Sequence, residues 1–125
     1  MALKNIILYI LAIIFILIII VFVINSRIND KNSIDDIYQV EIIIKDNRFY
    51  PATIRIPSGK KTYLIVTNQD NTPEEFESIE LHRERIIMPN ETVKIILAPL
   101  TPGTYNFFGE FHQETAQGSI IVYQD

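Results

Sequence analysis

An unbroken run of 19 apolar or aromatic residues, Ile6 to Ile24, constrains this chain more than any other feature. At about 1.5 Å per residue, a helix over this run is roughly 28 Å long, close to the ~30 Å hydrocarbon core of a bilayer. A secretory signal has a shorter apolar region of ~7–15 residues and small residues before its cleavage point. The segment Asn25-Ser26-Arg27 offers no such pattern. The sequence therefore predicts an uncleaved transmembrane anchor over residues 1–25, with a cleaved signal as the weaker alternative.

The charges that flank the run do not by themselves set its orientation. Lys4 lies before the run, and Arg27 and Lys31 lie after it, so the positive-inside comparison is nearly balanced. A short cytoplasmic N-terminus with the rest of the chain outside is the simpler arrangement. We therefore expect a single-pass protein of the cell membrane whose larger part lies on the periplasmic or extracytoplasmic side.

Composition excludes several classes of function. Residues 26–125 hold all 15 acidic residues and ten of the 11 basic ones, and the chain contains no cysteine. The acidic balance argues against nucleic acid as a partner, because nucleic acid requires a basic face. The lack of cysteine excludes disulfides, zinc ribbons and thiolate copper sites. An acidic surface suits metal cations or basic partners, or only keeps a protein soluble.

A polar linker is expected over residues 26–36, after which the pattern changes to short β-prone runs separated by turn residues. These runs are rich in β-branched and aromatic residues and recur every 8–12 residues or so. The expected strands cover residues 38–45, 53–56, 62–67, 86–87, 92–97, 105–108 and 119–123. The acidic residues 70–84, which include Pro73, are expected to form a loop or a short helical turn. The pattern predicts an all-β Greek-key sandwich or barrel over residues 37–125.

Two acidic groups and one histidine carry possible metal-binding chemistry. Glu110 and His112 follow a predicted strand, and alternation along an extended segment places them on the same side. Five glutamates lie within the eleven residues from Glu74 to Glu84, and they repel one another unless a cation lies nearby. Glu114 and Gln117 are further oxygen donors. Oxygen ligands with one imidazole favour iron, manganese, Cu(II) or zinc over Cu(I).

Each of these features also has a plainer interpretation. A lone histidine such as His112 is ordinarily a surface or hydrogen-bonding residue, and an acidic run is ordinarily a solvated face. His82, beside Arg83 at an expected strand edge, is interpreted as a surface residue. Phe107, Phe108 and Phe111 are expected in the core.

Several longer phrases of the sequence resemble a known family. The opening of cupredoxin domains is similar to Phe49-x-Pro51-x-x-Ile54-x-Ile56-x-x-Gly59-Lys60 and Leu64-x-Val66-x-Asn68-x-Asp70. A narrower group, the cupredoxin-like domains of bacterial iron-uptake systems (Efe-type and ferrous-iron transport), resembles Pro73–Ser78, Leu81-x-Arg83-Glu84, Pro102–His112 and Thr115–Gly118. The resemblance covers about residues 38–123, nearly all of the chain beyond the apolar run.

The resemblance implies that the blue-copper ligands are changed in this chain. The copper cysteine falls on Gly109, its partner histidine is retained as His112, and the axial methionine falls near Gln117. Without the thiolate a blue site is not expected. The binuclear copper domain of cytochrome oxidase also joins an anchor to a cupredoxin, but it needs two cysteines. Glu75 or Glu77 stands at the position of another copper histidine. The metal site that the resemblance implies consists of Glu75, Glu77, Glu110 and His112, with Glu84 and Gln117 as further ligands.

The function that the resemblance implies is the binding of copper and/or iron in iron uptake. The domain would act as a metal relay or as the Fe(II) oxidation partner of an inner-membrane iron permease or an electron-transfer protein. An autonomous enzyme is not expected, because the sequence offers no second ligand cluster or cofactor motif. The alternative is a cupredoxin fold without metal that docks a basic partner through its acidic run.

Overall fold

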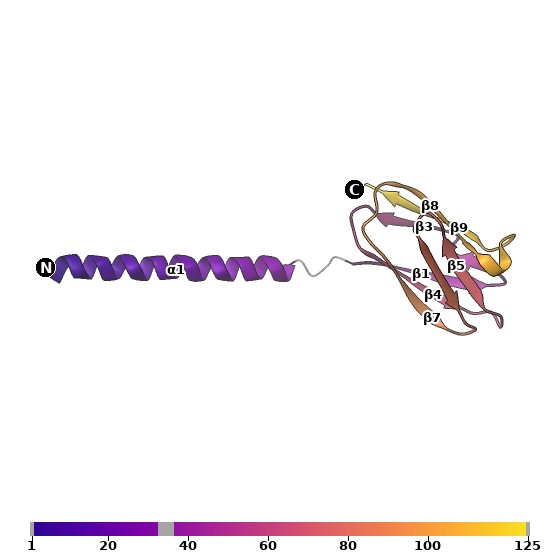
Figure 1. Ribbon diagram of the computed structural model, residues 1–125, viewed down its shortest axis with the longest axis horizontal. Coiled ribbons are helices and arrows are strands. Elements are labelled where there is room, and N and C mark those ends of the chain that lie inside the picture. The colour runs from indigo at the N-terminus through magenta and orange to yellow at the C-terminus, as the bar shows by residue number, and fades with distance from the viewer. Residues whose placement is uncertain (1, 33–36, 125) are drawn as a thin grey trace. The chain divides into compact units, whose positions relative to one another are not determined.

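The computed structural model describes residues 2–32 and 37–124, and the chain divides into two compact units, Met1–Asp35 and Asp36–Asp125 (Figure 1). The first unit contains α1 (Ala2–Asn32). Its part from Ala2 to Ile28 is long and apolar enough to cross a membrane, and by the same measure it suits a signal sequence. A helix satisfies its own backbone N–H and C=O groups, as the interior of a bilayer requires.

Helix α1 continues past residue 25 into the segment that the sequence predicts as a linker. It ends at Asn32, and the residues after the apolar run include no proline or glycine that would stop it earlier. Residues 33–36 of the predicted linker lie outside the described residues.

The second unit is a sandwich of two sheets, which confirms the predicted all-β fold (Figure 1). Its strands are β1 (Tyr38–Lys45), β2 (Arg48–Tyr50), β3 (Thr53–Pro57), β4 (Thr62–Asn68), β5 (Glu74–Ser78), β6 (Arg83–Ile87), β7 (Thr92–Leu97), β8 (Gly103–Gly109) and β9 (Gln117–Tyr123). One sheet has the order β2-β1-β4-β7, and the other has the order β3-β9-β8-β5-β6. The pairs β1–β4 and β3–β9 are parallel, and the other pairs are antiparallel.

Three buried phenylalanines join the two sheets beneath the candidate site. Phe49, Phe76 and Phe107 lie on β2, β5 and β8, and each is almost fully buried. The ring of Phe107 lies 5.0 Å, between centroids, from the rings of both other residues. Such aromatic pairs contribute about 0.5–1.5 kcal/mol each beyond the burial of their area. The cluster therefore fixes β5 and β8 against each other where both strands lead into the site.

The prediction of a loop or helical turn over residues 70–84 is wrong, because this segment contains β5 and the start of β6. Along β5, Glu74, Phe76 and Ser78 are buried, while Glu75 and Glu77 are only partly buried. Two of the three inward positions hold polar residues, so hydrophobicity does not reveal the period of two. The hydroxyl of Ser78 donates a hydrogen bond of 2.7 Å to the carbonyl oxygen of Asn106 on β8, which satisfies it inside the sandwich.

A second set of polar contacts fixes the loop that enters β5. The buried Asn68 side chain donates hydrogen bonds of 2.9 Å to the carbonyl oxygens of Thr72 and Ile87. The carboxylate of Asp70 accepts the N–H groups of Asp46 and Asn47, at 2.7 and 2.9 Å, in the tight turn between β1 and β2. These contacts place the start of β5 beside the β1–β2 turn.

Candidate metal centre

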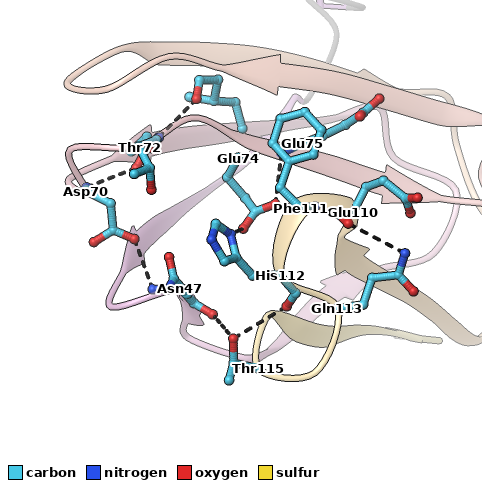
Figure 2. A network of polar contacts seen from close by, with 12 residues as sticks. Asn47, Asp70, Thr72, Glu74, Glu75, Glu110, Phe111, His112, Gln113 and Thr115 are labelled. Atoms are coloured by element: carbon cyan, nitrogen blue, oxygen red, sulfur yellow. Dashed lines mark hydrogen bonds and ion pairs between the residues drawn. The ribbon is translucent and has the colours of Figure 1, made fainter.

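The centre of the candidate site is a buried carboxylate in contact with an imidazole. Oε2 of Glu74 lies 2.6 Å from Nδ1 of His112, and the two side chains are 2% and 30% exposed. Oε1 of Glu74 accepts the backbone N–H groups of Phe111 and Glu75, each at 3.0 Å. Figure 2 shows the carboxylate between β5 and the turn that carries His112. Hydrogen bonds to a charged group contribute about 1.5–3 kcal/mol each, so these contacts offset the cost of burying Glu74.

The segment that carries the histidine is a single turn of 3₁₀ helix, η1 (Glu110–His112), and not the extended segment expected from the sequence. The carbonyl oxygen of His112 accepts the N–H groups of Thr115 and Ala116 at 3.1 and 2.8 Å, which closes the turn. Glu110 and His112 consequently point in different directions (Figure 2). The turn also carries Phe111 outward, so that its side chain is 45% exposed and not in the core as expected.

Gly109, where the resemblance places the copper cysteine, has no room for a side chain. A Cβ atom at this position would lie 2.6 Å from Cδ of Glu74 and 2.7 Å from Cβ of Ala116. Real Cβ contacts are longer than this, so the carboxylate of Glu74 fills the volume that a cysteine would need.

Four of the predicted ligands lie on one surface, which we call the acidic face: Glu75, Glu77, Glu84 and Glu110. Glu77 stands directly opposite Glu84 in the β5–β6 pair, an unfavourable arrangement for like charges. Desolvation raises the pKa of Glu77 above its ordinary value. Repulsion from Glu110, a hydrogen bond that protonated Glu77 donates to Glu110, and repulsion from Glu75 and Glu84 raise this pKa further. Within residues 2–32 and 37–124, no ion pair compensates these four carboxylates.

The six predicted ligands do not converge on one point. His112 contacts Glu74. Glu75 and Glu110 both point away from His112 (Figure 2). The side-chain amide of Gln117 donates a 2.8 Å hydrogen bond to the carbonyl oxygen of Gln113. No three His, Cys, Asp or Glu side chains of the described residues are arranged to hold a metal ion. The six-residue site therefore stays a prediction.

The sequence reasoning missed Glu74 as the partner of His112. Glu75 and Glu77 were expected there because they resemble a displaced copper histidine. The available signal was the alternation of Glu74 with Phe76 and Ser78, which places Glu74 on the inward face of an extended segment.

Comparisons with known proteins agree on the fold. The family model of the cupredoxin-like domain matches residues 12–122. An uncharacterised protein of Rickettsia prowazekii (strain Madrid E) is 50% identical over 119 residues, which cover 95% of this chain and 94% of that protein.

Two solved structures have similar backbones. Auracyanin A, a "blue" copper protein from Chloroflexus aurantiacus, is 15% identical with a TM-score of 0.62, covering 70% of this chain and 100% of that one. The metal binding domain of a Cu(I) exporting P-type ATPase from Streptococcus pneumoniae D39, determined with Cu(I), is 18% identical with a TM-score of 0.59, covering 73% and 99%. At these identities the likeness is one of fold alone.

A methyl group at position 109 tests the close contact with Glu74. The backbone of Gly109 is extended, with φ of −91°, and accepts alanine, so any penalty of Gly109→Ala comes from packing. We expect a loss of about 1–3 kcal/mol in the free energy of unfolding, measured by denaturant titration. The loss should be smaller when Glu74→Ser is already present, because the Glu74 atoms are then gone and only the contact with Ala116 remains. Equal losses in both backgrounds would contradict the contact.

The repulsion on the acidic face predicts a pH-dependent effect of Glu77→Gln. A carboxyl whose pKa is raised by folding destabilises the folded state when it is ionised, and this cost disappears below its unfolded pKa. Glu77→Gln should therefore raise the midpoint of thermal unfolding at neutral pH, and the gain should vanish near pH ~4. The same substitution at Glu41, an exposed residue on β1, serves as the control. A gain that is independent of pH would contradict the assigned repulsion.

Proposed function

The chain belongs to the cupredoxin-like domain family, and on that premise we propose that it is a membrane-tethered, extracytoplasmic domain that binds a transition-metal ion, copper and/or iron. Its role is in iron uptake, as a metal relay or as the Fe(II) oxidation partner of an inner-membrane permease. The observation that carries the proposal is the partly exposed imidazole of His112, whose Nδ1 lies 2.6 Å from the carboxylate of the buried Glu74.

The donors present fit some metal ions and not others. A blue copper centre does not fit, because the chain has no cysteine and the carboxylate of Glu74 fills the space at Gly109. One imidazole with carboxylate oxygens nearby fits a borderline divalent cation such as Cu(II), Fe(II) or Zn(II). A bound copper ion would supply a one-electron acceptor for Fe(II), whereas a bound iron ion would itself be the cargo.

The residues of the chain divide the work between attraction and binding. The acidic face raises the local concentration of cations, because its charges have no compensating partner among the described residues. The pKa of Glu77 is raised by desolvation and by repulsion from the neighbouring glutamates, and a cation close to this face relieves the repulsion. His112 supplies the nitrogen donor. Glu75, Glu77, Glu84, Glu110 and Gln117 remain the proposed oxygen ligands.

The N-terminal helix supports a role next to a membrane protein. If α1 spans the bilayer, it confines the domain to the membrane surface, where a permease is present at a high effective concentration. A relay domain gains from this confinement because an ion that it releases is captured close by.

A second candidate function is the docking of a basic protein partner without metal. The charges of the acidic face favour it, because they have no ion-pair partner among the residues that the structure describes. Such docking weakens as salt rises, because exposed charges are screened over ~10 Å at 0.1 M. Chelators leave it unchanged. Metal-dependent function has the opposite response, so the two candidates separate in one pull-down experiment with salt and chelator arms.

Calorimetric titration tests the proposed metal site directly. The full chain in detergent micelles is titrated with Cu(II), Mn(II), Zn(II) and, without oxygen, Fe(II). We expect at least one of these ions to bind, and His112→Ala to weaken that binding at least tenfold because the nitrogen donor is lost. His82→Asn is the matched control, since His82 is exposed and asparagine accepts its positive φ of 51°. Unchanged affinity in a Glu75→Gln, Glu110→Gln, His112→Ala triple variant would overturn the site.

A further inference from the structure

We infer that the metal-binding atom of this site is Nε2 of His112, and that Glu74 is a positioning residue which keeps the ring proton on Nδ1. This inference rests on the proposed function and assigns its binding atom. It places the ion on the outer side of the imidazole, in a surface hollow, and not in the interior of the sandwich.

The hydrogen bonds of Glu74 determine which ring nitrogen is free. Oε1 accepts two backbone N–H groups, and Oε2 is 2.6 Å from Nδ1. A carboxylate that accepts on both oxygens takes the Nδ1 hydrogen as well, so the neutral ring keeps its lone pair on Nε2. Histidines that bind metals commonly donate their other N–H to a carboxylate in this manner, which fixes the ring and raises its basicity.

Packing closes the Nδ1 side and leaves the other side open. Behind Nδ1 lie the carboxylate of Glu74, Gly109 and Ala116, in contacts too close to admit an added methyl group. An ion at Nδ1 must take the place of the 2.6 Å contact between Nδ1 and Oε2 of Glu74. On its other side, His112 borders a surface hollow lined also by Asn47, Phe111, Gln113, Glu114 and Thr115. An ion that enters from this hollow displaces only solvent.

The walls of the hollow are held in place by hydrogen bonds. The hydroxyl of Thr115 donates to the carbonyl oxygen of Asn47 at 2.7 Å, which joins the turn after η1 to the turn between β1 and β2 (Figure 2). Asp70 holds that second turn through the N–H groups of Asp46 and Asn47. The ring of His112 is therefore oriented before an ion arrives.

The ligand class follows from the donors that face the hollow. Nε2 is one nitrogen donor, and the exposed Glu114 lines the same hollow. The glutamates of the acidic face do not line this hollow, so an ion at Nε2 takes its oxygen donor from Glu114. A borderline divalent cation bound there keeps positions for water or for the ligands of a partner. An open coordination shell of this kind suits an ion that is handed on.

Replacing Glu74 by glutamine tests the role of its charge with little change in shape. The amide oxygen of Glu74→Gln stays with the N–H groups of Phe111 and Glu75, which need an acceptor. The amide NH₂ then faces Nδ1 and donates to it, so the ring proton moves to Nε2 and blocks the metal-binding atom. A merely structural role for Glu74 predicts no such change of tautomer.

The experiment is NMR of the full chain in detergent micelles with ¹⁵N-labelled histidine, first without metal and then with Zn(II). For His112 we expect a protonated Nδ1 and a bare Nε2, with Zn(II) shifting the Nε2 signal. In Glu74→Gln the proton should appear on Nε2, and the affinity for Zn(II) should fall about 10–100-fold. Glu41→Gln is the matched control on an exposed strand position, and the His82 signals are the internal reference.

The outcomes separate the assignment of Nε2 as the binding atom from the proposed metal function. A proton on Nε2 in the unaltered chain, or a Zn(II) shift at Nδ1, overturns the inference and leaves the proposed metal function standing. The expected tautomers without binding of Zn(II) or of any ion used in the calorimetry support the positioning role of Glu74 and overturn the proposed function. The expected tautomers with a Zn(II) shift at Nε2 support both.

Discussion

The arrangement of this end of the sandwich depends on the buried carboxylate of Glu74. Burying a charge is costly unless hydrogen bonds compensate it, and Glu74 accepts the backbone N–H groups of Glu75 on β5 and of Phe111 on η1 and contacts Nδ1 of His112. The orientation of the imidazole, the path of the η1 turn and the need for glycine at position 109 all follow from the position of this one group. Removing the carboxylate would leave two backbone N–H groups without an acceptor and His112 without its contact at Nδ1.

The position of this group also bears on the comparison with blue copper proteins of the same fold. The resemblance places the copper cysteine at Gly109, where Glu74 now fills the space. The interior position thereby becomes a hydrogen-bonded carboxylate and imidazole pair. The proposed metal chemistry then belongs to the surface, where His112 is partly exposed and the acidic face carries charges without ion-pair partners among the described residues. A harder and more exchangeable ion is the expected ligand of such a surface.

The fold could be predicted from the sequence because its signals are local. The apolar run of residues 6–24 gives the helix, and runs of β-branched residues such as Thr62–Asn68 give strands whose alternation matches their burial. The strand β5 was missed because glutamate and serine occupy inward positions, where only their long-range partners on η1 and β8 make burial tolerable. Those partners are separated from β5 by 28 to 38 residues, and no local pattern indicates them.

The site could be predicted only in part, for the same reason. The sequence predicts His112 and the glutamates of the acidic face as the groups that carry chemistry. Which of them meet depends on the η1 turn, because a turn does not place Glu110 and His112 on the same side as an extended segment would.

Whether an ion binds at His112 is the central claim, and elemental analysis of the full chain purified without chelators tests it most directly. The account predicts copper or iron at about one ion per chain in the unaltered protein and its loss in His112→Ala. Metal-free protein that also fails to take up added ions, or metal retained in His112→Ala, would contradict it.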